Sequence, residues 1–230
     1  MKRALLLSNS TIHGESFLDW AEEAIRDFLG DRRRIVFVPY AMADLDGYTG
    51  LARERLARMG YEVRGAHESD AAAVLRDADA IFTGGGNTFR LLTQVYRTGL
   101  YDPLRDAALE KGIPYIGSSA GTNLACPTIK TTNDMPIVYP PSFDALGIIP
   151  FQINPHYLDP QPESSHMGET REQRIREFHE MNDVPVLGLR EGSYLRVEKG
   201  TMTLGGRTNA RLFRKGSEPS EHRPGERIAL

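Results

Sequence analysis

Short apolar segments alternate with longer amphipathic segments through the first half of the chain. The short segments have the length of strands, and several are apolar throughout, which is typical of strands covered on both faces. Such alternation predicts βαβ units and an α/β fold with a mostly parallel sheet. We expect these strands at residues 4–7, 35–39, 62–65, 80–83 and 115–117.

The segments between these strands carry apolar residues at helical spacing. Gly60 and Gly112 stand where the C-caps of two of the helices belong. We expect helices at residues 15–29, 48–59, 88–97 and 102–111.

The alternation of short apolar and longer amphipathic segments ends after Gly121. Residues 127–162 hold eight prolines and few periodic apolar positions, so we expect a long loop there, a kind of segment that often has a functional role. Thr170 and Gln173 have the spacing of a capping box, which predicts a helix that ends near Asn182. The last dozen residues should fray. Before them we expect short antiparallel strands at residues 186–189, 194–197, 202–204 and 211–213.

Bulk composition limits the class of protein. The 230 residues are 40% hydrophobic and 26% charged, which is ordinary for one globular domain over residues 1–230, and no apolar run is long enough to cross a membrane. The net charge of −3 and the mixing of basic with acidic residues predict no nucleic-acid partner. With no footprint for nucleic acid, we expect the partner to be a small molecule. Cys126 is the single cysteine and cannot form an internal disulfide, so we expect a cytoplasmic protein. A homodimer is the default expectation for its assembly.

The clearest chemical signal is the sequence Gly117-Ser118-Ser119-Ala120-Gly121, which follows an expected strand and precedes a segment compatible with a helix. A G-x-S-x-G sequence in this context predicts a nucleophile elbow, a sharp turn whose strained serine needs small neighbours. Ser119 is then the candidate nucleophile. The alternative interpretation is a Gly-rich turn that only links strand to helix, or that binds a phosphate at the helix N-terminus.

A second glycine cluster, Gly84-Gly85-Gly86-Asn87, also lies between an expected strand and an expected helix. Acyl transfer needs N–H donors for an oxyanion, and these usually come from the residue after the nucleophile and from a neighbouring Gly-rich loop. Ala120 and either Gly85 or Gly86 fit those places. Dinucleotide binding is the competing interpretation, but the G-x-G-x-x-G spacing is absent and the cluster follows the fourth strand, not the first.

A serine nucleophile needs a base, and His156 is our candidate among the six histidines. It follows an apolar segment and a proline that restricts the backbone. His166 is its competitor. His67 and His222 lie in polar, surface-like settings and His179 on the exposed side of an expected helix, so these three suit the role less well.

The imidazole in turn needs an acid that orients it. Glu191 stands where an expected strand ends in a turn, and Asp134 lies in the loop just downstream of the elbow, so both are candidates. A chain order of Ser119, His156 and Glu191 differs from the order in α/β-hydrolases, which argues against a lipase or esterase.

Six blocks of sequence, in order from the first strand to about Gly206, resemble the peptidase E (alpha-aspartyl dipeptidase) family of serine peptidases. The blocks are LLLSNST, TGGGNTFRLL, YIGSSAGTNLACPTIKTTNDMPIV, FDALGIIPFQINPH, GETREQRIREF and LGLREGSYL. The resemblance implies a serine peptidase that hydrolyses dipeptides with an N-terminal aspartate and uses no metal or organic cofactor. It also implies a flavodoxin-like, three-layer α/β sandwich similar to class I glutamine amidotransferase domains.

The same resemblance assigns roles to individual residues. It implies a triad of Ser119, His156 and Glu191, in agreement with the choices made from the residues themselves. The corresponding oxyanion donors are Gly85, Gly86 and Ala120. One departure stands out, because the family has an aromatic residue before the nucleophile where this chain has Ser118, and this puts substrate selectivity in doubt.

An aspartate side chain in a binding site needs a cation or several N–H donors. Arg171, in the first turn of the capped helix, is our candidate because a guanidinium binds a carboxylate with two hydrogen bonds. The alternative is that Arg171 is a solvated helix charge paired with a nearby glutamate. Asn87 and Thr131 are weaker candidates for the polar ends of the ligand, and Glu169 or Asp134 for its ammonium group.

Three other functions stay open. A cyanophycinase-like peptidase would share the elbow and the GGGN loop but cleave β-aspartyl-arginine units, and the NPH and GETREQRI blocks argue against it. An amidotransferase-like enzyme would use Cys126 as nucleophile, but Cys126 lies seven residues beyond Ser119 and misses the elbow. A non-catalytic, amidotransferase-like binding domain would keep the fold without the chemistry, and the presence of a candidate triad argues against that.

Overall fold

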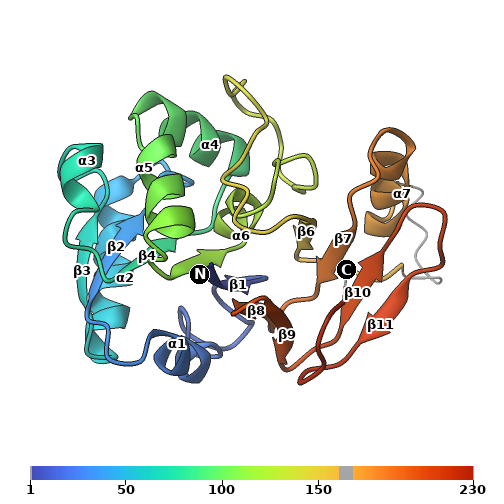
Figure 1. The fold of residues 1–230 in the computed structure, drawn as a ribbon, viewed down its shortest axis with the longest axis horizontal. Helices are drawn as coiled ribbons and strands as arrows, with labels where there is room; N and C mark the ends of the chain where they lie inside the picture. Colours follow the sequence, from blue (N-terminus) through green and yellow to red (C-terminus); the bar gives the residue numbers. More distant parts are fainter. Residues whose placement is uncertain (1, 161–167, 230) are drawn as a thin grey trace.

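The computed structural model describes residues 2–160 and 168–229 and arranges them in two β-sheets with helices around them (Figure 1). Five strands of the larger sheet run parallel: β1 (Arg3–Leu7), β2 (Arg34–Val38), β3 (Glu62–Gly65), β4 (Ala80–Thr83) and β5 (Tyr115–Ser118). Two antiparallel strands, β8 (Ser193–Glu198) and β9 (Thr201–Gly206), extend it beyond β1. Of the described strands, these seven have the order β3-β2-β4-β5-β1-β8-β9, which confirms the predicted α/β class with a mostly parallel sheet.

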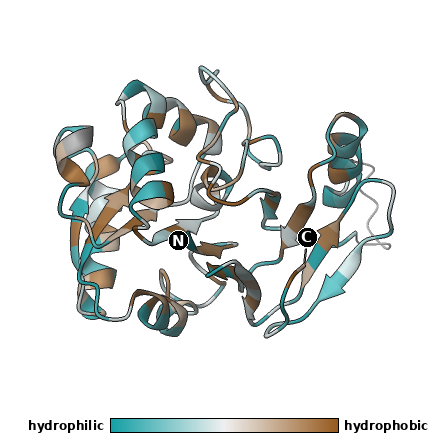
Figure 2. Ribbon diagram, viewed as in Figure 1, coloured by the Kyte–Doolittle hydropathy of each residue, from teal (hydrophilic) through white to brown (hydrophobic). Residues whose placement is uncertain are grey.

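Helices cover both faces of this sheet and make a three-layer sandwich (Figure 1). Leu5 and Leu7 of β1 pack with α1 (Glu22–Leu29) and α2 (Leu45–Arg58), whereas Ala4 and Leu6 point to the opposite face, because successive strand residues alternate. Figure 2 shows apolar residues along the central strands. The opposite face is covered by α3 (Ala71–Val74), α4 (Thr88–Arg97), α5 (Tyr101–Arg105), the π-helical turn η1 (Asp106–Glu110) and α6 (Ala120–Leu124).

The smaller sheet lies beside the larger one, beyond β8 and β9 in Figure 1. Its described strands are β6 (Gln152–Pro155), β7 (Val186–Leu189), β10 (Ala210–Phe213) and β11 (Ser220–His222), in the order β11-β10-β7-β6. β6 and β7 are parallel, and the other pairs are antiparallel. Helix α7 (Arg171–Met181) packs Ile175 against Val186 and Phe213 of this sheet. The capping box of Thr170 and Gln173 that the sequence predicted is present at its start.

Several boundaries differ from the sequence-based expectations. The predicted helix at 15–29 begins only at Glu22, because Leu18 has a φ of 61° and the chain before α1 forms turns. α2 begins earlier than expected, since the Asp44 side chain caps it by accepting the N–H of Gly47. The predicted helix at 102–111 is divided between α5 and η1, and α3 was missed.

The second half contains more order than the sequence indicated. The stretch at 127–162, predicted as a long loop, includes β6, and the predicted antiparallel strands divide between two sheets. The prediction that the last dozen residues fray is wrong, because β11 lies there and Ile228 is buried, with its N–H bonded to the carbonyl of Met202. None of the described helices has the length and apolar character needed to span a bilayer.

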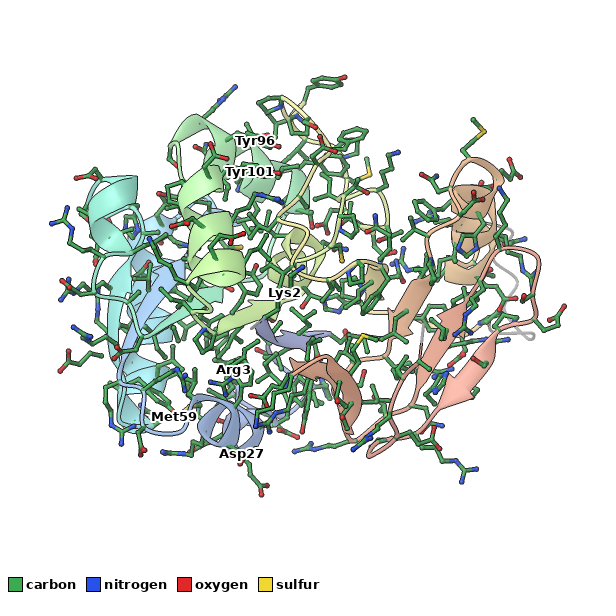
Figure 3. The ribbon with its side chains drawn as sticks, in the orientation of Figure 1. Lys2, Arg3, Asp27, Met59, Tyr96 and Tyr101 are labelled. Atoms are coloured by element: carbon green, nitrogen blue, oxygen red, sulfur yellow. The ribbon has the colours of Figure 1, made fainter. Side chains whose placement is uncertain are left out.

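Two tyrosines fasten the long segment that follows α6 to the helical layer. The rings of Tyr96 and Tyr101, labelled in Figure 3, stack with their centroids 4.4 Å apart. Their hydroxyl groups donate to the carbonyls of Asp144 and Ala145, at 3.0 and 2.9 Å. The segment between α6 and β6 has little secondary structure, but these hydrogen bonds anchor its C-terminal part to α4 and α5.

Candidate active site

Ser119 lies at the sharp turn between β5 and α6. Its φ is 52°, in the left-handed region that residues with a β-carbon rarely adopt, and its N–H donates to the carbonyl of Leu7 at 3.1 Å. The neighbouring glycines leave room for this turn, because a Cβ on Gly117 would overlap the carbonyl oxygen of Gly121, and one on Gly121 would overlap that of Thr83. The local conformation is therefore that of a nucleophile elbow.

Ser119, His156 and Glu191 form a hydrogen-bonded chain. The Nε2 atom of His156 is 2.9 Å from Ser119 Oγ, and its Nδ1 atom is 2.7 Å from Glu191 Oε1. With the proton on Nδ1, the imidazole donates to Glu191, and Nε2 accepts the hydroxyl hydrogen of Ser119. The structure thus brings together the three side chains that the sequence suggested as nucleophile, base and acid. They reach the site from β5, from the end of β6 and from the turn after β7.

The rival acid, Asp134, occupies a different position. Its Oδ2 atom accepts the N–H of Thr88 at 2.8 Å, the hydroxyl of Thr88 at 2.6 Å and the hydroxyl of Thr132 at 3.1 Å. Within the part of the chain that the structure describes, this carboxylate makes no hydrogen bond to His156. The geometry therefore favours Glu191 over Asp134 as the group that orients the imidazole.

Three other histidines, His67, His179 and His222, have hydrogen-bond partners away from Ser119. His166 lies outside the described residues. The expectation for His179 was wrong, because this side chain is buried and its Nε2 atom is 3.1 Å from the carbonyl oxygen of Val184. His67 bonds to Asp46. The imidazole of His222 lies 3.1 Å from the hydroxyl of its neighbour on β11, Ser220.

An open cavity of about 500 Å³ surrounds the hydroxyl of Ser119. Its polar lining includes His156 and Asp134, so a ligand there would meet the imidazole and a carboxylate together. No lysine or arginine is among the described residues that line it. The polar segment after β1, the glycine loop and an apolar wall complete the lining through Asn9, Ser10, Thr11, Gly85, Gly86, Phe17, Met42, Tyr48 and Leu51.

Of the three N–H groups expected to bind the oxyanion, one already donates a hydrogen bond within the protein. The N–H of Gly85 donates to the hydroxyl oxygen of Tyr48 at 2.9 Å and is therefore already occupied. The N–H groups of Gly86 and Ala120 have no acceptor among the described residues. Gly86 has a φ of 133°, and a Cβ there would lie 2.6 Å from the carbonyl oxygen of Ala41, so only glycine fits. Gly86 and Ala120 remain the available pair.

Asn87 and Thr131, two of the expected substrate-binding residues, form hydrogen bonds with other parts of the chain. Asn87 caps α4: its Oδ1 atom accepts the N–H of Arg90 at 3.0 Å, and its Nδ2 group donates to the carbonyl of Met135 at 2.9 Å. Thr131 is buried and donates to the carbonyl of Ile153 at 2.9 Å. Neither residue lines the cavity. The structure gives both of them a role in holding loops.

Arg171 makes no hydrogen bond or ion pair with any described residue, and its neighbour Arg174 takes the nearby Glu169 instead, at 3.5 Å. Burial and the charge of Arg174 lower the pKa of Arg171, and the charge of Asp134 opposes that shift. Arg171 is not among the described residues that line the cavity. An unpaired, partly buried cation in this position is compatible with binding an anion.

Ser118 and Cys126 lie in the interior. Ser118 is fully buried and does not line the cavity, so its side chain belongs to the core beneath the elbow. Burial raises the pKa of Cys126 to about 12, and its sulfur accepts the N–H of Ile153 at 3.3 Å. A buried thiol of this kind is unreactive, which argues against Cys126 as a nucleophile. No group of three or more His, Cys, Asp or Glu side chains in residues 2–160 and 168–229 is placed to hold a metal ion.

Sequence reasoning missed three residues that support the site: Ser8, Asn9 and Tyr48. Asn9 is buried, and its Oδ1 atom accepts the N–H of Gly192, next to Glu191, at 2.9 Å. For Ser8 and Asn9, a signal was available in the sequence, because they begin the polar run after the apolar strand β1. Ligand sites in parallel sheets form at the carboxyl ends of strands.

Comparisons with known proteins identify the relatives of this chain. A family model described as peptidase family S51 matches residues 4–205. Peptidase E of Streptomyces coelicolor is 60% identical over 218 residues, which cover 94% of this chain and 89% of that protein. The probable alpha-aspartyl dipeptidase of Drosophila melanogaster is 48% identical over 226 residues, which cover 97% of this chain and 94% of that protein.

Two solved structures share the fold. A putative peptidase E protein from Listeria monocytogenes EGD-e has a TM-score of 0.68 at 23% identity and covers 90% of this chain and 100% of its own. A peptidase from an acI-B1 Actinobacterium has a TM-score of 0.73 at 17% identity and covers 100% of this chain and 97% of its own. The family match over most of the chain and the close relatives lead to one conclusion: the chain belongs to peptidase family S51 and is a serine peptidase.

Proposed function

We propose that this enzyme is an aspartyl dipeptidase that hydrolyses dipeptides with an N-terminal aspartate through an acyl-enzyme on Ser119. The observation that carries the proposal is the hydrogen-bonded chain from Glu191 through His156 to Ser119 at the edge of an open cavity. The names of two relatives, peptidase E and probable alpha-aspartyl dipeptidase, support the substrate class.

In the acylation step, Ser119 Oγ attacks the carbonyl carbon of the aspartyl residue while His156 Nε2 takes the hydroxyl proton. Glu191 keeps the second imidazole proton on Nδ1 and stabilises the imidazolium that forms. The N–H groups of Gly86 and Ala120 supply hydrogen bonds to the oxyanion. His156 then returns the proton to the departing amine as the C–N bond breaks, and a water molecule activated by the same imidazole cleaves the ester.

The charges around the cavity suit a dipeptide with a free N-terminus. Thr88 and Thr132 bond to Oδ2 of Asp134, while Oδ1 has no partner among the described residues, and this supports Asp134 as the proposed partner of the α-ammonium group. Arg171 stays the proposed partner of the aspartate side chain, because it has no ion pair among the described residues and a guanidinium binds a carboxylate with two hydrogen bonds. The ligand's ammonium and carboxylate would then lie between two groups of opposite charge.

We also propose a cytoplasmic location. Cys126, the single cysteine, is free and buried, so this chain can form no internal disulfide. Proteins of oxidising compartments are commonly stabilised by disulfides, and a single free cysteine suits the reducing cytoplasm better.

The test is hydrolysis of Asp-Leu, Ala-Leu, Glu-Leu and β-aspartyl-arginine by the wild type, by Ser119→Ala and by Ser217→Ala, with EDTA present. We expect cleavage of Asp-Leu alone, a loss of about 10⁵- to 10⁶-fold in kcat for Ser119→Ala, and no effect of Ser217→Ala, since Ser217 is exposed in the turn after β10. Activity in Ser119→Ala would refute the nucleophile. Preferred cleavage of β-aspartyl-arginine would replace the proposed substrate by that of a cyanophycinase-like enzyme.

A further inference from the structure

The hydroxyl group of Tyr48 binds the glycine loop next to the nucleophile. The N–H of Gly85 donates to Tyr48 Oη at 2.9 Å, and Gly85 itself packs on Ser119, since a Cβ built on it would lie 3.1 Å from Ser119 Cβ. Tyr48 and Ser119 line the same cavity. The phenol oxygen is therefore one hydrogen bond away from a residue that touches the nucleophile.

The position of this phenol is fixed by its surroundings. Its ring meets Phe37 edge-on, with centroids 5.0 Å apart, and Phe17 edge-on at 6.2 Å. Gly84 lets the hydroxyl come close to the loop, because a Cβ there would lie 2.6 Å from Tyr48 Oη. A donor held in this way needs little reorganisation when charge develops nearby.

The hydroxyl also has an unused hydrogen. A phenol accepts and donates hydrogen bonds, and Tyr48 accepts one from Gly85 but donates to no described residue. Burial raises the pKa of Tyr48 to about 12, so the hydrogen is present at neutral pH. One polar hydrogen is thus free beside the cavity.

We propose that the Tyr48 hydroxyl is a donor of the oxyanion hole and replaces the occupied N–H of Gly85 alongside the N–H groups of Gly86 and Ala120. The inference rests on the proposed acylation of Ser119. As the bond from Ser119 Oγ to the carbonyl carbon forms, the carbonyl π electrons move to oxygen, and Tyr48 donates a hydrogen bond to that oxygen without transferring its proton. The C=O bond re-forms when the C–N bond breaks.

The first test is Tyr48→Phe, which keeps the ring contacts and removes the hydroxyl. We expect kcat for Asp-Leu to fall about 10²-fold with KM nearly unchanged, because the hydrogen bond is made to the transition state. Tyr61→Phe is the control, since Tyr61 is buried in the same apolar cluster that Tyr48 packs against but does not line the cavity. An unchanged kcat, or a rise in KM alone, overturns the inference.

A second variant separates donation to the oxyanion from support of Gly85. Replacing Tyr48 with 3,5-difluorotyrosine lowers the pKa of the phenol. An oxyanion donor is lost when the phenol ionises, so kcat should gain an alkaline limb at a lower pH than in the wild type. A phenolate still accepts the N–H of Gly85, so a purely supporting role predicts no such limb, and its absence overturns the inference.

A third measurement separates this inference from the proposed substrate. A fluorophosphonate labels an activated serine, and its phosphoryl oxygen enters the oxyanion hole, so the rate of labelling at Ser119 can be followed by mass spectrometry without any dipeptide. Slower labelling of Tyr48→Phe than of wild type supports the inference even if Asp-Leu is not the substrate. Equal rates overturn it, whereas a wild type that is not labelled at all refutes the proposed nucleophile.

Discussion

The hydroxyl group of Ser8 joins the end of β1 to the backbone of His156. Ser8 is fully buried, and its Oγ atom accepts the N–H of His156 at 2.9 Å and donates to the carbonyl of Leu189 at 2.8 Å. His156 follows β6, and Leu189 ends β7, so one hydroxyl ties two strands of the smaller sheet to the larger sheet. The backbone of His156, which this hydrogen bond anchors, has a φ of 53°, in the left-handed region that non-glycine residues uncommonly adopt.

Replacing Ser8 with alanine should impair both stability and catalysis. The variant leaves the N–H of His156 without its acceptor, whereas the carbonyl of Leu189 still accepts the N–H of Tyr157 at 2.9 Å, so we expect the free energy of unfolding to fall by about 1 to 3 kcal/mol. A displaced imidazole should lower kcat by up to about 10²-fold. Urea unfolding and steady-state kinetics measure the two effects, with Ser217→Ala as the control. A stable, fully active Ser8→Ala enzyme would show that His156 does not depend on this hydrogen bond.

Variants of the two rival acids should affect different kinetic constants. Glu191→Gln cannot stabilise the imidazolium of His156, so we expect kcat to fall by about 10² to 10⁴-fold while KM changes little. Asp134→Asn should instead raise KM for Asp-Leu, because it removes the proposed partner of the substrate ammonium group. Steady-state kinetics on both variants check this. The opposite pattern would make Asp134 the orienting acid.

The glycine before the elbow should tolerate no side chain. In Gly117→Ala the new Cβ overlaps the backbone of Gly121, so the turn must shift, and we expect a loss of about 1 to 3 kcal/mol in the free energy of unfolding together with lost activity. Gly50→Ala is the matched control, because Gly50 lies inside α2 with no atom within 4 Å of the added Cβ. That change should stabilise the protein by about 0.5 to 1 kcal/mol. Thermal unfolding of both variants checks the contrast.

Asp79 should make stability depend on acid pH. The hydrogen bonds of the Arg34 guanidinium and of the backbone N–H groups of Arg34 and Arg33 hold the pKa of Asp79 well below its usual range. A depressed pKa in the folded protein adds stability above the unfolded pKa of about 3.9 and loses it as the pH falls through the folded pKa.

We therefore expect Asp79→Asn to lower the free energy of unfolding by about 1 kcal/mol at neutral pH. This difference from the wild type should shrink below about pH 4. Urea unfolding at a series of pH values measures it, with Asp31→Asn, at an exposed site, as the control. A pH-independent difference would mean that ionisation of Asp79 contributes nothing.

The chain's local conformations were largely readable from the sequence. The elbow at Ser119, the capping box at Thr170 and the strands of the parallel sheet depend on steric and hydrogen-bonding rules among residues a few positions apart. The helix predicted at 15–29 failed because Leu18 takes a positive φ, which no periodicity of apolar residues can reveal.

The contacts that select among distant residues were decided only by the tertiary structure. His156 meets Glu191 and not Asp134 because β6 and β7 are parallel neighbours and bring the residues after their ends together, a pairing invisible across 35 positions of sequence. For the same reason the sequence did not reveal the partners of Tyr48 and Ser8, since Gly85 and His156 are 37 and 148 positions away. Sequence by itself determined which groups can react and how the turn at Ser119 bends, because those depend on neighbouring atoms. Which of these groups come into contact depends on how the two sheets pack against each other. That packing involves residues from the whole core, so no local stretch of sequence determines it.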